Sequence, residues 1–107
     1  MSVPARTEEQ RTAALHAALA ARTARARLRL ELKDRRLNGV DVIEGAAGNP
    51  LWAALRVTWL LGCLPGVGEV RAERMLASAG IAPSRRIQGL GSRQRAALIH
   101  ALTREGR

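Results

Sequence analysis

Hydrophobic and polar positions along the chain recur at the intervals of three and four residues that are typical of α-helices. No stretch alternates apolar and polar residues between turn signals, so the pattern predicts no β-sheet. The first expected element is a long helix, in which Thr7 and Gln10 form a capping box and Asn38-Gly39 is the stop. A narrow apolar strip along this helix consists of Leu19, Ala26, Leu30 and Leu37.

Shorter helices are expected after this long one. The first covers residues 41–47 and is interrupted by glycines. The next begins at Asn49-Pro50, an N-cap followed by proline at the first helical position, and continues over 51–61. Trp52 and Trp59 lie seven residues apart on that helix, a spacing typical of a buried face, so we expect both in the core.

Two further helices are expected in the C-terminal third. One covers residues 69–79 and ends at Gly80, and its packed face consists of Val70, Ala72, Met75, Leu76 and Ala79. A connector over 81–90 follows, with one helical turn at 84–86. Gly91-Ser92 then begins a final helix that continues through Leu102. The whole pattern predicts an all-α fold.

Charged residues divide the chain into two basic ends and a nearly neutral middle. Residues 1–36 carry +5 (nine cations, four acids), residues 37–84 carry −1 (three cations, four acids) and residues 85–107 carry +5 (six cations, one acid). The total is +9, which favours a polyanion as partner. We expect a basic helical arm at residues 1–39 and a multi-helix core at residues 40–107.

The arm segregates its charges when residues are placed at helical intervals of about 100°. Acids such as Glu31 and Asp34 fall on one side, where they can pair with nearby arginines. Cations on another side fall within an arc of roughly 80°. They are Arg11, Arg22, Arg25, Arg29, Lys33 and Arg36. Such a stripe is usually a solvated face, but its segregation also suits contact with a polyanion.

The aromatic content favours a double-stranded partner. The chain has no Phe, no Tyr and only two Trp, whereas recognition of unpaired bases relies on aromatic side chains for stacking.

Cys63 is the single cysteine and cannot form an internal disulfide, so we expect a small core residue in a reducing compartment. The longest apolar run, 51–61, contains Arg56 and is too short to span a bilayer. We expect a cytoplasmic protein without a membrane segment.

No group of residues indicates catalysis or metal binding. His16 and His100 are isolated, and no cysteine or carboxylate pair has metal-ligand spacing. The glycine turn at residues 66–68 lacks the later Lys-Ser/Thr of a P-loop, and no strand is expected before it. We therefore expect a protein that is not an enzyme and has no cofactor.

Two glycine-containing loops are the strongest chemical signal. Leu64-Pro65-Gly66-Val67-Gly68 has the spacing of a helix-hairpin-helix or helix-two-turn-helix loop. Gly89-Leu90-Gly91-Ser92 repeats the arrangement, and each loop begins a helix whose first amides can bind a phosphate. Arg85-Arg86 and Arg93 lie close to the second loop. The alternative is an ordinary tight turn, an exposed Arg-Arg turn and a Ser92 that only caps a helix.

These motifs together resemble the actinobacterial integration host factor family. The similarity is strongest from Leu55 to Leu98 and extends more weakly into the basic arm. The resemblance implies a long N-terminal helix and a helix-two-turn-helix core. It also implies a nucleoid-associated protein that bends double-stranded DNA with little sequence preference and assists phage integration. In such a protein the glycine turn, the helix after it and the Arg-Arg pair contact phosphates.

The chain departs from the family pattern at three positions close to the same loops. Glu69 and Glu73 stand where the family tends to have lysine, and Gln88 stands where a third arginine is common. The candidate DNA-binding residues are Gly66, Val67, Gly68, Arg71, Arg74, Arg85, Arg86, Gln88, Gly91, Ser92 and Arg93. The candidate residues for a second DNA contact are Arg22, Arg25, Arg29, Lys33 and Arg36.

The leading hypothesis from the sequence is a monomeric, non-enzymatic protein of the nucleoid that binds double-stranded DNA and assists an integrase–DNA complex. Two alternatives remain open at this point. One is an RNA-binding or ribosome-associated role, because a small-subunit ribosomal protein uses a similar motif. The other is a helical protein-interaction module in which the arm pairs with a partner helix.

Overall fold

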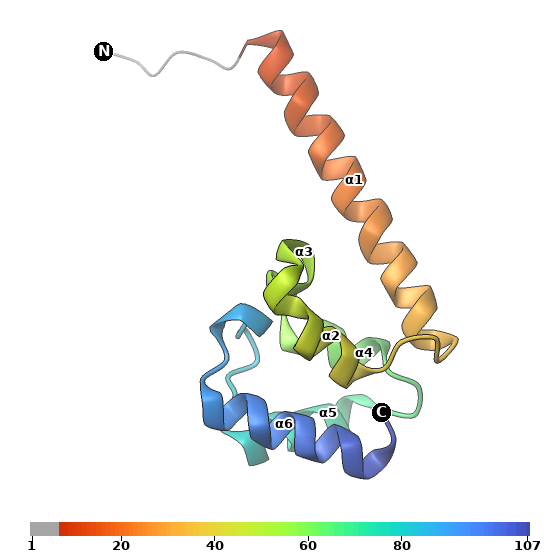
Figure 1. The fold of residues 1–107 in the computed structure, drawn as a ribbon, viewed down its shortest axis with the longest axis vertical. Coiled ribbons are helices and arrows are strands. Elements are labelled where there is room, and N and C mark those ends of the chain that lie inside the picture. The colour runs from red at the N-terminus through yellow and green to blue at the C-terminus, as the bar shows by residue number, and fades with distance from the viewer. Residues whose placement is uncertain (1–6) are drawn as a thin grey trace.

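The computed structural model describes residues 7–107, and every regular element in this range is helical (Figure 1). The elements in order are α1 (Glu8–Lys33), α2 (Gly39–Gly45), the 3-10 helix η1 (Ala46–Gly48), α3 (Pro50–Ala53), α4 (Val57–Cys63), α5 (Glu69–Ala79), the 3-10 helix η2 (Ile87–Gly89) and α6 (Ser92–Glu105). The predicted all-α fold is therefore confirmed. The first six residues of the predicted arm lie outside the described residues.

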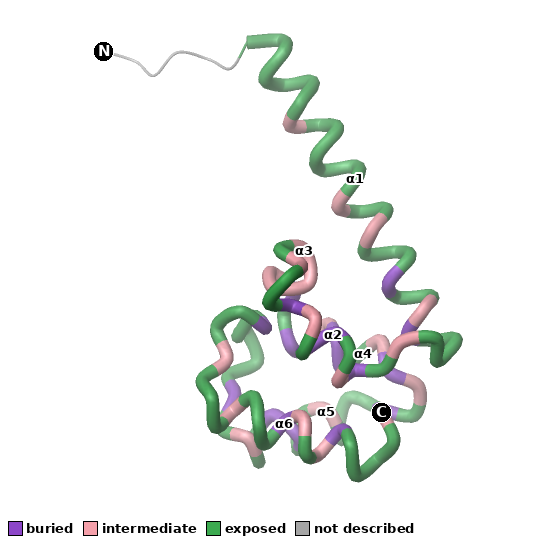
Figure 2. The backbone as a smooth tube through the Cα atoms, in the orientation of Figure 1, coloured by how far each residue is buried: buried purple, intermediate pink, exposed green. Residues whose placement is uncertain are grey.

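Helix α1 begins at the predicted capping box. The Gln10 amide donates to Thr7 Oγ1 at 3.1 Å, and the Thr7 amide donates to Gln10 Oε1 at 2.9 Å. The helix then projects away from the other helices, and its fully buried residues are confined to its C-terminal end (Figure 2). Leu28 and Leu32, 3% and 1% exposed, attach it to the core, where its closest neighbour is α4.

The predicted stop of α1 was wrong. The helix ends at Lys33, and Arg35 takes the left-handed conformation with φ of 60°. Asn38 instead begins α2: its Oδ1 accepts from the Asp41 amide at 2.8 Å, and its own amide donates to Asp41 Oδ2 at 2.9 Å. Asparagine is common at helix N-caps as well as at helix C-termini. Here Asp41, three residues later, completes a capping box with Asn38 and so favours the N-cap.

The apolar strip along α1 lies mostly in solvent. Leu19 and Leu30 are 47% and 59% exposed, because α4 meets the face of α1 that carries Leu28 and Leu32. Most of α1 has no neighbour among the described residues, so its remaining leucines stay in solvent. One is Leu15, which is 58% exposed.

The helix predicted over 51–61 is divided into α3 and α4. Between them Arg56 is extended and forms an isolated antiparallel bridge with Arg86. The Val57 amide donates to the Arg85 carbonyl at 3.0 Å, and the Ile87 amide donates to the Leu55 carbonyl at 2.9 Å. These bonds join positions about thirty residues apart in the chain, and they replace the helical bonds that the local pattern predicts.

The division places the two tryptophans on separate helices, so they share no face. Both are half-buried at the edge of the core. Trp52 packs on Gly45, where a Cβ would lie 2.7 Å from the indole ring. Trp59 lies beneath the Arg29 guanidinium, whose carbon is 5.5 Å from the ring centroid. The prediction that both are core residues is correct only for their inner faces.

Helices α5 and α6 pack side by side in opposite directions. The Gln94 amide Nε2 at the start of α6 donates at 2.7 Å to the carbonyl of Gly80, the left-handed residue that ends α5 as predicted. At the other end Arg71 of α5 meets Glu105 of α6. Val70 is 62% exposed, so the predicted packed face of α5 was wrong at this position. The predicted helical turn at 84–86 is also displaced and occurs at η2.

One hydrophobic core joins the end of α1 to the five helices that follow. No polar or charged residue in the described range is buried. The core residues are Leu28, Leu32, Val42, Ile43, Ala46, Leu55, Val57, Leu60, Leu61, Leu64, Val67, Met75, Leu76, Ile81, Ile87, Leu98 and Leu102. The core therefore holds both glycine-containing loops in place from beneath.

Candidate nucleic-acid interface

The glycine turn leaves the N-terminus of α5 open. Gly66 has φ of 76°, which favours glycine, and Gly68 is an N-cap whose position supplies no side-chain acceptor. The first intrahelical bond at this end is donated by Ala72 to the Gly68 carbonyl at 2.9 Å. The amides of residues 69–71 therefore have no acceptor among the described residues, and they carry the positive end of the helix dipole.

Val67 has a different role from the two glycines beside it. Its side chain is only 9% exposed and belongs to the core, and its amide donates to the Leu64 carbonyl at 3.2 Å. Among the candidate residues of the turn, Val67 therefore anchors the loop, whereas the amides after Gly68 remain available to an anion.

Arginines surround the open end of α5. A groove of about 800 Å³ between α5 and α6 is lined by Arg71, Arg74 and Arg104. The Arg107 guanidinium lies over Gly66, with its terminal nitrogens 2.7 and 2.8 Å from the position that a Cβ would take. We call the three amides and the cations Arg71, Arg74, Arg104 and Arg107 the turn site.

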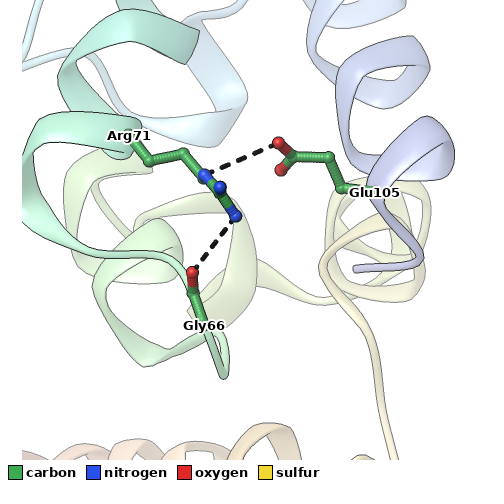
Figure 3. A network of polar contacts seen from close by, with 3 residues as sticks. All are labelled: Gly66, Arg71 and Glu105. Atoms are coloured by element: carbon green, nitrogen blue, oxygen red, sulfur yellow. Dashed lines mark hydrogen bonds and ion pairs between the residues drawn. The ribbon is translucent and has the colours of Figure 1, made fainter.

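Figure 3 shows how Arg71 is held within the turn site. Its Nη1 donates to the Gly66 carbonyl at 3.4 Å, and its Nε lies 3.8 Å from Glu105 Oε1. The pair is solvated, with side-chain exposures of 51% and 32%, so its strength is modest. Arg71 is thus aligned along the groove, and unused guanidinium donors remain for an anion.

The second glycine-containing loop opens α6 in a similar way. Gly91 is the N-cap, and its amide donates to Gln94 Oε1 at 2.9 Å. Ser92 is the first helical residue, so α6 begins at Gly91-Ser92 as predicted, with Gly91 as the N-cap. The Arg95 amide is the first to bond within the helix, to the Gly91 carbonyl at 2.9 Å, which leaves the amides of 92–94 open.

Arg85 and Arg86 contribute to the fold of the connector as well as to its charge. Arg85 Nη1 donates to the Gly89 carbonyl at 2.9 Å, and Arg86 Nη1 donates to the Ala54 carbonyl. Both side chains remain exposed, and so does Gln88. The connector site is defined as Arg85, Arg86, Gln88, Gly91, Ser92 and Arg93.

The antiparallel packing of α5 and α6 separates the two sites. The turn site lies where α5 begins and α6 ends, and the connector site lies at the other end of the pair. Helix α5 has 11 residues, so the ends are about 16 Å apart. The candidate residues therefore lie in two separate groups, whereas their proximity in sequence suggested a single one.

The cationic residues of the arm lie partly over α4. Arg22, Arg25 and Arg29 line a hollow whose other wall includes Trp59, and Lys33 lines the next one. Arg36 lies beyond the helix end, so the stripe that we predicted through it stops at Lys33. We call Arg22, Arg25, Arg29 and Lys33 the arm stripe.

Cys63 lies beside the arm stripe, half-buried and without a disulfide. Burial raises the pKa of its thiol, and the neighbouring Arg29 guanidinium offsets part of that rise. Over residues 7–107 no three His, Cys, Asp or Glu side chains lie close enough to hold a metal ion. None of the helices in this range has the length and hydrophobicity that crossing a membrane requires.

The candidate residues from the sequence omitted two members of the turn site. Arg104 and Arg107 reach it from the far end of α6 because the helices run antiparallel. Their positive charge near the end of the last helix was visible in the sequence. The helix pairing that brings them to Gly66 depends on contacts between distant segments and left no local signal.

Comparisons with known proteins agree with this arrangement. A family model described as an S13-like H2TH domain matches residues 32–102. The integration host factor of Mycobacterium tuberculosis is 44% identical over 99 residues, which cover 92% of this chain and 94% of that protein. The integration host factor of Streptomyces coelicolor is 44% identical over 98 residues, which cover 92% of each.

A solved structure is also similar. It is described as sIHF bound to an 8-base-pair palindromic DNA, and it matches with a TM-score of 0.75 at 39% identity. The match covers 81% of this chain and 98% of that one. The family model, with bounds at residues 32 and 102, includes both glycine-containing loops.

Proposed function

The chain belongs to the integration host factor family and contains an S13-like H2TH domain, and from this premise we propose that it binds double-stranded DNA as a non-enzymatic architectural protein. The observation that carries the proposal is the open N-terminus of α5. Three amides that have no acceptor within residues 7–107 face a groove that is lined by several arginines. Such a site suits a phosphate and reads no base.

Two phosphate sites about 16 Å apart would contact separate points on the DNA backbone. The turn site anchors one phosphate group, and the connector site contacts another through the α6 amides, Arg85 and Arg93. The arm stripe adds a third basic surface over α4. Contacts on several surfaces favour bending or bridging of DNA over simple coating, and phosphate contacts alone give low sequence specificity.

The carboxylates Glu69 and Glu105 lie in the same groove as the arginines of the turn site. They lower the local positive potential, so this chain should bind a phosphate less tightly there than a site lined only by cations. We therefore propose moderate affinity with a salt dependence smaller than the net charge suggests.

The decisive experiment measures affinity for a random duplex of about 25 base pairs over a range of salt concentrations. Arg74→Gln with Arg104→Gln removes two cations that line the groove of the turn site, at exposed positions. The slope of log K against log salt should fall by about 1.8, at about 0.9 per lost phosphate contact. Affinity should weaken equally for all sequences.

Arg27→Gln with Arg35→Gln is the matched control, because it removes the same charge from exposed residues outside the three basic surfaces. An equal loss in the control would show that only the overall charge matters, and an unchanged slope in the turn-site variant would show that its two cations contact no phosphate. The turn site would then have to be abandoned as the DNA contact.

Structured RNA is the second candidate ligand, because backbone amides and arginines bind any phosphate backbone, and because the matching domain is described as S13-like. Adding structured RNA as a competitor in the same titration distinguishes the two candidates. If RNA displaces the duplex at lower concentration than unlabelled duplex does, the ribosome-associated alternative is favoured.

We further propose that the phosphate-binding unit is a single chain, because each site is formed by residues of one chain. We also propose that it acts on the nucleoid in the cytoplasm, which rests on the proposed DNA binding. A role beside an integrase–DNA complex follows from the family. Its test is the yield of integrase-mediated recombination with and without this protein, with the turn-site variant as the comparison.

A further inference from the structure

Helix α5 borders a second groove, which shares Glu69 with the groove of the turn site. It has a volume of about 390 Å³ and is bounded by Thr58 of α4 and by the connector at Ile81 and Pro83. Its floor includes Leu76, and its wall on α5 includes two alanines. An apolar groove between a helix and a connector is a shape into which another helix can lie.

The rim of this groove is acidic although the chain is basic. Glu69 and Glu73 lie one turn apart on α5, and both are exposed. Neither forms an ion pair within residues 7–107, and like charges at this spacing oppose helix formation. We call this feature the acidic groove. Its apolar floor and anionic rim match an amphipathic helix that carries cations beside its apolar residues.

The N-terminal half of α1 has this composition. Leu15 and Leu19 are 58% and 47% exposed, and they lie one turn apart on the same face. Arg11 precedes Leu15 by one turn, and Arg22 follows Leu19 by nearly one turn. No core residue covers this face, since α1 stands clear of the other helices along most of its length (Figure 2).

We propose that two copies of this chain associate by placing the N-terminal half of α1 from one copy in the acidic groove of the other. Leu15 and Leu19 contact the apolar floor, and Arg11 and Arg22 pair with the glutamates on the rim. A chain cannot fill its own groove because its α1 projects away from α5 (Figure 1).

The contact uses Glu69, which also lines the groove of the turn site, but none of the arginines of the turn site and no residue of the connector site lines the acidic groove. Of the arm stripe, only Arg22 takes part in the contact. One chain therefore remains the phosphate-binding unit, while copies held together by their arms can connect neighbouring stretches of DNA. This contact goes beyond the proposed function and does not depend on it. It replaces the expectation of a strict monomer with association that depends on concentration.

Sedimentation equilibrium of the full chain without DNA, over a wide concentration range, tests the contact directly. We expect reversible self-association that is weakened roughly 30-fold by Leu15→Gln with Leu19→Gln, from the apolar area that these two side chains bury. Glu69→Lys with Glu73→Lys should weaken it at least roughly tenfold by placing like charges opposite Arg11 and Arg22. Adding Arg11→Glu and Arg22→Glu to that charge variant should restore it.

Matched controls separate docking from general effects. Val70→Gln removes a side chain of α5 that is 62% exposed and lies outside the acidic groove, so it should leave association unchanged. Asp34→Lys with Glu44→Lys makes the same change in net charge at exposed positions elsewhere. Circular dichroism of each variant confirms that the helices are intact.

Three results would overturn the proposal. The first is a monomer at every concentration. The second is a leucine variant that no longer associates while the glutamate variant associates like wild type, which would indicate arm-to-arm pairing. The third is failure of the charge exchange to restore association in a folded protein.

Discussion

Replacing Gly66 by alanine tests the central feature of the turn site. Gly66 has φ of 76°, a conformation that costs a residue with a Cβ about 1–2 kcal/mol. The new methyl group would also lie within 2.8 Å of both terminal nitrogens of Arg107, so the guanidinium must move away. Because that group ends a flexible side chain, most of the expected loss of stability comes from the backbone.

Two other glycines supply controls for each part of this calculation. Gly80 also has positive φ, 65°, but no atom lies within 4 Å of the position that a Cβ would take there, so Gly80→Ala carries the backbone cost alone. Gly62 is a helical residue with equally open surroundings, and Gly62→Ala should stabilise by about 0.5–1 kcal/mol. The free energy of unfolding measured in urea should therefore be higher for Gly62→Ala than for wild type. For Gly66→Ala and Gly80→Ala it should be about 1–2 kcal/mol lower than for wild type.

Duplex binding then separates Gly66 from Gly80. Gly66→Ala displaces Arg107 and reorients the amides of 69–71, so its affinity for DNA should fall, whereas Gly80→Ala should leave the turn site intact. Thermal unfolding gives a second measure of stability, at about 4–8 °C for each kcal/mol in a domain of this size. Equal stability of Gly66→Ala and Gly62→Ala would refute the backbone argument. A destabilised Gly66→Ala that binds DNA like wild type would refute the turn site.

Three further predictions concern the core, the connector and the thiol. Leu32→Ala should destabilise by about 2–5 kcal/mol because Leu32 is buried, whereas Leu30→Ala, at an exposed position, should change the free energy of unfolding by less than about 0.5 kcal/mol. Arg86→Ala should cost about 1–2 kcal/mol through its lost bond to the Ala54 carbonyl, whereas Arg93→Ala should weaken DNA binding with little change in urea unfolding. Cys63 should react with a disulfide reagent at mildly alkaline pH more slowly in the folded than in the urea-unfolded protein, because burial raises its pKa; equal rates would contradict this.

The local sequence predicted those elements whose signals are local. The Thr7–Gln10 capping box and the left-handed Gly80 need only residues within one turn, and both occur as expected. Asn38 was ambiguous, because asparagine suits a helix start and a helix end alike. The break between α3 and α4 arises from pairing of residues 55–57 with residues 85–87, which no window of the local pattern includes.

The same distinction applies to the candidate site. Both glycine-containing loops open helices, as the spacing of Gly66-Val67-Gly68 indicated, because a turn and its helix are neighbours in sequence. Their separation to opposite ends of the α5–α6 pair, and the approach of Arg107 to the first loop, depend on which way two helices pack. That direction follows from the shape of the whole core and cannot be read from either helix alone.

The attachment of α1 has a mechanical consequence. Leu28 and Leu32 are its buried residues, Arg29 adds a contact with Trp59, and about 20 residues extend beyond them toward the N-terminus, a distance of about 30 Å. A tilt of about 10° at this base would displace the far end by about 5 Å, the rise of one helical turn. A small change in how Leu28 and Leu32 pack against α4 would therefore cause a large displacement of the N-terminal end of α1. The position of any partner bound at that end would change with it.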